Sequence, residues 1–166
     1  MKPYSKRRGA ALALCLASVS MPTQAMQMSS RLSTVNSPSA APKVTQIIAY
    51  LRSALGKRYR LGAAGENQAY DCSGLVQRAY ASAGHLLPRV TTQQIKAGHT
   101  VSPAAIKAGD LLFYRFDDTP AGRLHVAVYI GQGRAIHASV SHKKVRQVDI
   151  TTAVWQTHFI TAVRPA

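Results

Sequence analysis

The chain has 166 residues, which suits one ordinary domain and is short for two. Apolar residues make up 46% and charged residues 16%, a balance that excludes a disordered chain, and two cysteines are too few for a disulfide-stapled miniprotein. The 21 Lys and Arg against 6 Asp and Glu give a formal charge of +15, and no apolar run reaches the length of a membrane-spanning helix.

Residues 1–25 are typical of a secretory signal peptide. A positively charged start, an apolar run over 9–21 and a cleavage site ending at Ala25 come in the expected order. A buried N-terminal helix is the alternative. Cys15 raises lipidation as another, ranked lower because Leu14 stands where a lipidation signal carries a small residue. We therefore expect export to the periplasm or cell envelope, with secretion from the cell as the second choice.

Removal of this segment changes the charge of the remaining chain. It takes four basic residues and no acid, which leaves 17 basic against 6 acidic residues and a formal charge of +11. Export and the scattered placement of Lys and Arg argue against nucleic acid as the partner. We expect attraction to the cell wall or to an anionic membrane surface, with general solubility as the plainer explanation.

Residues 26–42 are rich in Ser, Pro and Ala and predict a flexible linker. Apolar residues then recur at helical spacing from Val44 to Leu55, and Gly56 supplies a stop. A second helix is expected just after Cys72 and ends at Gly84. Its apolar face comprises Leu75, Val76, Ala79, Tyr80 and Ala83.

The second half of the chain has the pattern of strands. We expect one short helical turn first and then a polar loop among the strands. The turn covers 92–96, the loop 117–122, and the strands 110–114, 125–130, 134–139, 145–150 and 159–163. Helices followed by strands predict an α+β domain over residues 43–166, with N-terminal helices packed on a central antiparallel β-sheet.

Cys72 is the single cysteine left once the predicted signal peptide is removed. At the start of a helix, unpaired backbone N–H groups and the helix dipole favour thiolate over thiol. Gly74 allows another part of the chain to approach closely, and backbone N–H groups there could bind an oxyanion. The alternative is a buried, inert cysteine packed as a small apolar side chain.

His125 and His137 lie on the two strands of a predicted hairpin. If Ile130 pairs with Arg134 across a three-residue loop, both histidines share one face as diagonal neighbours, whereas a two-residue loop would separate them. The same face carries small side chains that would let the Cys72 helix pack close, Ala127 and Ala135.

These residues suggest a catalytic triad. Cys72 would attack a carbonyl, His125 would take its proton and return it to the leaving amine, and His137 would orient His125. Two incidental hairpin histidines are one alternative. A zinc site is another, although no motif with metal-ligand spacing supports it, and we expect no cofactor or metal. The other histidines are expected to be surface or structural residues: His85, His99, His142 and His158.

The run Asp71-Cys72-Ser73-Gly74-Leu75-Val76 resembles the nucleophile motif of the NlpC/P-60 family of cell-wall cysteine peptidases. Further blocks at 87–94, 109–114, 125–131 and 136–139 resemble the family in order and spacing. The resemblance implies a papain-like fold that hydrolyses peptidoglycan stem peptides, with Cys72 as nucleophile, His125 as base and His137 as the orienting residue.

The resemblance also implies substrate-binding residues. Tyr59 would lie beside the nucleophile and help to bind the reacting carbonyl, and Asp71 and Ser73 would contact the peptide amine or line the site. Tyr59 could instead be a packed loop aromatic, and Asp71 only the N-cap of the helix. Arg89 and Gln94 are interpreted first as residues that shape a loop.

Two departures from the family pattern bear on substrate preference. The stretch 61–65 lacks the usual adjacent glycine pair, and Val90 stands where a small hydroxyl residue is common. We expect an exported murein endopeptidase that forms a thioester acyl-enzyme and cuts the diaminopimelate–D-alanine crosslink. The D-glutamyl–diaminopimelate bond is the alternative within the same mechanism. A non-catalytic wall-binding module, a lipid acyltransferase and an injected toxin are the other classes considered.

Overall fold

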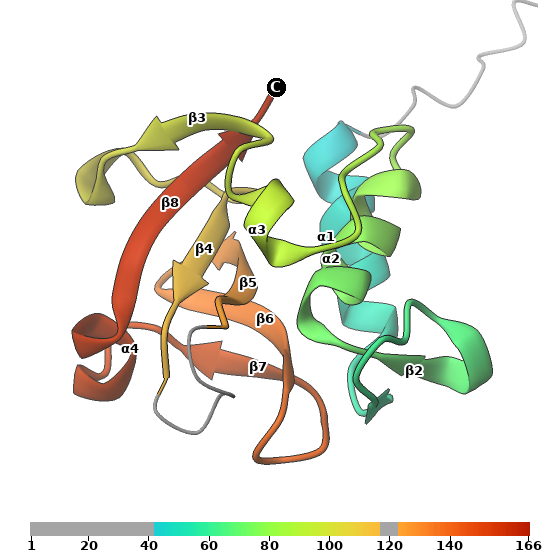
Figure 1. Ribbon diagram of the computed structural model, residues 1–166. Coiled ribbons are helices and arrows are strands. Elements are labelled where there is room, and N and C mark those ends of the chain that lie inside the picture. Colours follow the sequence, from blue (N-terminus) through green and yellow to red (C-terminus); the bar gives the residue numbers. More distant parts are fainter. Residues whose placement is uncertain (1–41, 117–122) are drawn as a thin grey trace, which may run out of the picture. The chain divides into compact units, whose positions relative to one another are not determined.

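The structure is a computed structural model and describes residues 42–116 and 123–166 (Figure 1). The predicted signal peptide, residues 26–41 of the predicted linker and the predicted polar loop lie outside the described residues. None of the helices in the described part is long and apolar enough to cross a membrane.

Helix α1 spans Lys43–Ser53 and buries the face that its sequence predicts, with Ile47 and Leu51 in the core. Gly56 adopts a φ of +79°, a conformation that side chains resist, so the predicted stop is confirmed. Leu55 falls in the turn beyond the helix and is 40% exposed, contrary to the expectation that it extends the apolar face.

Helix α2 spans Cys72–Ala81 and lies beside α1 (Figure 1). Its predicted apolar face is buried throughout. Gly84 follows with a φ of +73°, which confirms the predicted end. The predicted short turn is α3, Thr91–Gln94.

The strands form one eight-stranded sheet in the order β2-β1-β7-β6-β5-β4-β8-β3. Neighbouring strands are antiparallel except for the parallel β1–β2 pair at one edge, so the sheet is mixed. The strands are β1 Arg58–Tyr59, β2 Ala69–Tyr70, β3 Gly98–Val101, β4 Leu111–Tyr114, β5 His125–Gly131, β6 Arg134–Ser139, β7 Lys144–Asp149 and β8 Phe159–Pro165. Strands β1, β2 and β3 and the short helix α4, Ala153–Thr157, were not predicted.

The β5–β6 hairpin closes differently from the prediction but keeps its register. Gly131 pairs with Arg134, and Gln132 and Gly133 turn the chain with φ angles of +54° and +68°. The predicted Ile130–Arg134 pair is therefore wrong, because the turn has two residues. A register shift at Ile130 compensates for the shorter turn, so Tyr129 still pairs with Ala135 as the three-residue loop required.

The two faces of this hairpin enter different cores. Even-numbered side chains such as Val126 and Ile136 pack with α1 and α2, while Ala127 and Ala135 join a second cluster that contains Trp155. The expectation that Ala127 and Ala135 admit the Cys72 helix is therefore wrong. The bulkier even-numbered face supports the helices, and the small alanines on the other face leave space for aromatic rings.

Candidate active site

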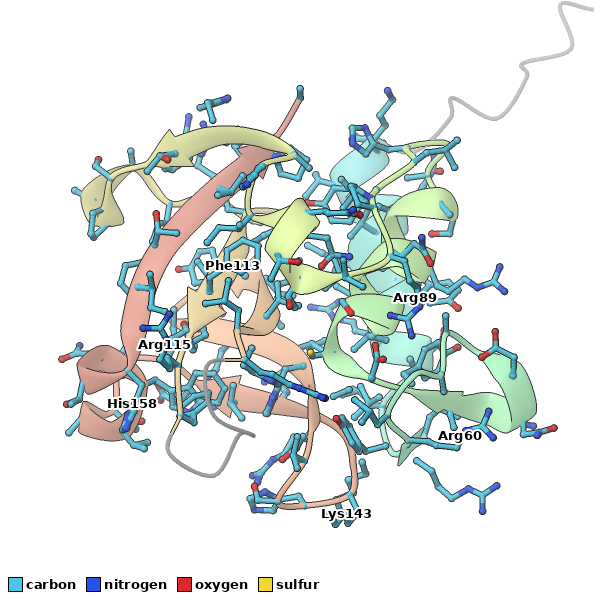
Figure 2. All side chains as sticks on the ribbon, viewed as in Figure 1. Arg60, Arg89, Phe113, Arg115, Lys143 and His158 are labelled. Carbon is cyan, nitrogen blue, oxygen red and sulfur yellow. The ribbon has the colours of Figure 1, made fainter. Side chains whose placement is uncertain are left out.

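The start of α2 is held by the carboxylate of Asp71, which is the N-cap of the helix. Asp71 Oδ1 accepts from Gly74 N at 2.7 Å, and Oδ2 accepts from Gly62 N at 2.8 Å. Arg89 donates to both carboxylate oxygens, through Nη1 to Oδ1 at 3.0 Å and through Nη2 to Oδ2 at 2.8 Å (Figure 2). Asp71 is buried, so a paired charge and several donors satisfy a group that would otherwise be costly to bury.

Ser73 belongs to the same network. Its hydroxyl donates to Asp71 Oδ1 at 3.3 Å and accepts from Arg89 Nη1 at 3.0 Å. Gln94, which is fully buried, donates from Nε2 to the carbonyl oxygens of Ser73 and Pro88 at 2.9 and 2.8 Å. Arg89 and Gln94 thus tie the following loop to the helix that carries Cys72. The geometry favours a structural role for Asp71 and Ser73, whose polar atoms are already engaged.

Gly74 packs directly against the backbone of another segment. A Cβ at this position would lie 2.3 Å from the carbonyl oxygen of Ala63 and 3.0 Å from Ala64 Cα. The close approach inferred from the sequence is therefore confirmed, and it fixes the segment after Tyr59 against the start of α2.

Cys72 is the first residue of α2; the residue as a whole is partly exposed, while its thiol is buried. Burial raises the pKa of its thiol to about 11, and the negative charge of Asp71 acts in the same direction. The backbone N–H groups of Val126, Ser73 and Cys72 lower the pKa but do not outweigh burial. The helix start thus acts on the thiol pKa in the predicted direction, but burial has the larger effect and raises the pKa.

Tyr59 lies within electrostatic range of Cys72 and Asp71, and the negative charge of either group, when ionised, acts on its hydroxyl. Burial is the largest cause of its raised pKa, followed by Cys72 and Asp71. The hydroxyl is therefore protonated at neutral pH and can act as a hydrogen-bond donor.

His125 and His137 are both buried and form one hydrogen-bonded pair. His125 Nε2 lies 2.8 Å from His137 Nδ1, with the two rings nearly perpendicular at 86°. Burial lowers the pKa of His125 to about 4. It also lowers the pKa of His137 well below its ordinary value, helped by the nearby His125 and Arg146. At neutral pH both imidazoles are uncharged, which is the form that can accept a proton.

Aromatic rings enclose the pair, which sequence reasoning missed. Phe116 contacts the ring of His125 at a centroid distance of 5.7 Å, and Trp155 contacts that of His137 at 5.0 Å, nearly perpendicular. Trp155 is the one Trp in the chain, which is the only sequence signal that could have drawn attention to it.

The structure brings Cys72 to the strand that carries His125. The backbone N–H that acts on the thiol belongs to Val126, the residue after His125. Within the described residues no hydrogen bond joins Cys72 Sγ to His125. The site thus consists of a thiol beside β5 and a neutral histidine pair on β5 and β6, an arrangement suited to nucleophilic acyl transfer.

A model of the NlpC/P60 family matches residues 56–164, which cover both the helix start and the histidine strands. This chain belongs to the NlpC/P60 family. The match contains every residue of the site described above.

Individual relatives agree with this assignment. Peptidoglycan endopeptidase RipB from Mycobacterium tuberculosis is 43% identical over 94 residues, which cover 57% of this chain and 37% of RipB. Murein DD-endopeptidase MepS/Murein LD-carboxypeptidase from Escherichia coli is 44% identical over 87 residues, 52% of this chain and 44% of MepS. The crystal structure of an NLP/P60 family protein from Staphylococcus aureus, similar to lipoprotein, gives a TM-score of 0.67 at 33% identity, covering 74% of this chain and 41% of that one. The chain therefore spans less than half the length of each of these relatives.

The NlpC/P60 domain has a pocket of about 630 Å³ beside the histidine pair. His125 and His137 line it together with residues of β6, β7 and α4, whereas Cys72 and Tyr59 do not. His158, labelled in Figure 2, also lines the pocket and lies just beyond α4. Across residues 42–116 and 123–166, no group of three or more His, Cys, Asp or Glu side chains is placed to hold a metal ion.

Proposed function

We propose that this chain is a cysteine endopeptidase that hydrolyses amide bonds in the stem peptides of peptidoglycan. The observation that carries the proposal is the neutral His125–His137 pair, joined at 2.8 Å, in which His125 lies on the strand that meets the Cys72 thiol. The names of two relatives, a peptidoglycan endopeptidase and a murein DD-endopeptidase, support the same substrate class.

In the proposed reaction, Cys72 Sγ attacks the carbonyl carbon as its proton passes to His125. The bond to His137 occupies His125 Nε2, so Nδ1 is the nitrogen that receives the proton. The Tyr59 hydroxyl and backbone N–H groups at the start of α2 donate to the oxyanion. Collapse of this intermediate breaks the C–N bond, the amine leaves with the proton from His125, and a thioester remains on Cys72. Water activated by His125 then hydrolyses the thioester and restores the thiol.

We propose the diaminopimelate–D-alanine crosslink as the bond that is cut. The similarity to MepS, whose name describes a DD-endopeptidase, supports this choice. Cleavage of the D-glutamyl–diaminopimelate bond would use the same residues and is the alternative. We also propose export through residues 1–25, which places the enzyme in the periplasm or cell envelope beside its substrate.

Digestion of purified wall sacculi tests the proposal. The purified protein and a Cys72→Ala variant are incubated with sacculi, and the products are identified by mass spectrometry. Crosslinked dimers should become monomers only with the intact thiol. Cleavage after D-glutamate would support the proposed mechanism but show that the D-glutamyl–diaminopimelate bond, and not the crosslink, is the one that is cut. Binding of both proteins with no change in the wall would favour a non-catalytic wall-binding module.

A further inference from the structure

The pocket beside the histidine pair carries a positive charge that no acidic side chain among the described residues pairs with. Arg146 lines it from β7, directly opposite His137 in the β6–β7 register, so both side chains emerge on the same face. Within the described part of the chain, Arg146 has no carboxylate partner and no side-chain hydrogen bond. Asp149, the one acid among the described lining residues, is held by Thr151 at 2.6 and 2.9 Å and faces Arg134 at 3.9 Å. A half-buried guanidinium without an anion is a ready carboxylate site.

A second group on the same wall also has no partner. His137 is 6% exposed, and its Nε2 atom is buried without a hydrogen bond. For His125 to present an unprotonated Nδ1 to the thiol, its Nε2–H must donate to His137 Nδ1. The proton of His137 then resides on Nε2. A buried N–H without an acceptor is unfavourable, so His137 carries an unsatisfied donor on the residue that lies opposite Arg146.

The direction of the reaction identifies which half of the substrate meets this pocket. His125 returns its proton to the leaving amine, so that amine must lie next to His125. His125 lines the pocket, while Cys72 and Tyr59, which hold the acyl half, do not. The pocket is therefore on the leaving-group side. Its volume of about 630 Å³ is within the usual range for ligand pockets, which is on the order of 300–1,000 Å³.

We propose that this pocket is the leaving-group subsite and that Arg146 binds a carboxylate of the departing diaminopimelate residue. The proposal rests on the proposed function and makes it more specific. In the crosslink, the amine that leaves has a free carboxylate on the same carbon. In the D-glutamyl bond, the carboxyl group on that carbon is joined to the next residue in longer stems. A guanidinium on the pocket wall, opposite His137, thus favours the crosslink and requires an unmodified carboxylate there.

The kinetic test compares two synthetic crosslinked peptides, one with that carboxylate and one with the corresponding carboxamide. Arg146→Gln should lower kcat/KM for the carboxylate peptide by about 10- to 100-fold and leave kcat/KM for the carboxamide peptide nearly unchanged. The reason is that only the carboxylate peptide loses a charge-assisted hydrogen bond. For the carboxylate peptide, the kcat/KM of Arg146→Lys should lie between those of the wild type and Arg146→Gln, since Lys keeps the charge but loses the bidentate geometry. The matched control is Arg52→Gln on the exposed surface of α1, which removes the same charge elsewhere. Equal effects of Arg146→Gln on both peptides, or effects no larger than those of Arg52→Gln, would overturn the proposal.

A binding measurement separates this proposal from the catalytic one. The amine product, a tripeptide ending in diaminopimelate, is titrated into the Cys72→Ala protein and its derivatives by calorimetry. Arg146→Gln in that background should weaken binding about 10-fold or more, and Arg52→Gln should not. If the wild-type protein fails to cleave but this difference holds, the subsite stands and the proposed activity fails. If cleavage occurs and the difference is absent, the subsite is wrong.

Discussion

His125 Nε2 and His137 Nδ1 lie 2.8 Å apart because a bulge in one strand compensates for a short turn. A two-residue turn alone would place the two histidines on opposite faces of the hairpin. The register shift at Ile130 restores the alternation, and both rings meet on one side among aromatic neighbours.

Replacement of His137 should impair the chemical step more than substrate binding. His137→Ala should lower kcat by about 100-fold or more with a small change in KM, because His125 loses the acceptor that fixes its tautomer. His137→Gln should recover part of the loss, since an amide oxygen can also accept from His125 Nε2–H. Steady-state kinetics on a defined stem peptide measures this. His99→Ala, an exposed position on β3, is the control. Equal kinetics for the Ala and Gln variants would argue against an orienting role.

The pH dependence of Cys72 alkylation in the free protein should reflect a raised thiol pKa. Burial raises that pKa to about 11, so the thiol stays protonated through neutral pH. The rate of reaction with iodoacetamide should therefore increase with pH up to the alkaline range, as the thiolate fraction grows. The modified Cys72 peptide is quantified by mass spectrometry at each pH. A fast rate that is constant between pH 5 and 7 would instead indicate a thiolate–imidazolium pair at rest.

The protein should lose stability in acid because of the buried histidines. The pKa of His125 falls from 6.5 to about 4 on folding, so the unfolded state binds more protons between these values. The free energy of unfolding is therefore highest, as far as His125 is concerned, above pH 6.5. It decreases by about 3 kcal/mol as the pH falls from 6.5 towards 4. Urea denaturation from pH 7 to 4 measures it. His125→Gln should flatten the dependence and His99→Ala should not. A wild-type midpoint that is constant over this range would contradict the prediction.

The ion pair between Arg89 and Asp71 should matter more for stability than the one between Arg134 and Asp149. Asp71 is buried and bound at two points, so Arg89→Ala leaves an unpaired buried charge and should cost about 3 kcal/mol. Arg134 and Asp149 are 3.9 Å apart and largely exposed, so Arg134→Ala should cost less than about 1 kcal/mol. Thermal and chemical denaturation of the two variants compares the pairs. Similar losses would show that the Asp71 network is not what holds the start of α2.

Much of the fold could be predicted from sequence periodicity. The apolar faces of α1 and α2, their glycine stops, and strands β4 to β8 follow from local spacing. Strands β1 and β2 have two residues each, too few for any alternation to be visible. The face of the hairpin that receives the helices could not be predicted either, because alternation separates two faces without saying what packs on each.

The candidate site was predictable as a set of residues but not as an electrostatic environment. The hairpin pattern places His125 and His137 on one face even though the turn differs. The local argument at Cys72 considered the helix dipole, while burial, which depends on the whole fold, has the larger effect on its pKa. Arg89 and Trp155 act through contacts that are distant in the sequence, so nothing adjacent to Asp71 or His137 indicates them.

Trapping of the acyl-enzyme tests the central claim most directly. The protein is mixed with a crosslinked stem peptide, quenched in acid within the first turnovers and analysed by intact and peptide-level mass spectrometry. The account predicts an adduct with the mass of the acyl half, located on Cys72, released by hydroxylamine and absent from Cys72→Ala. Product formation without an adduct, together with an active Cys72→Ala variant, would contradict it.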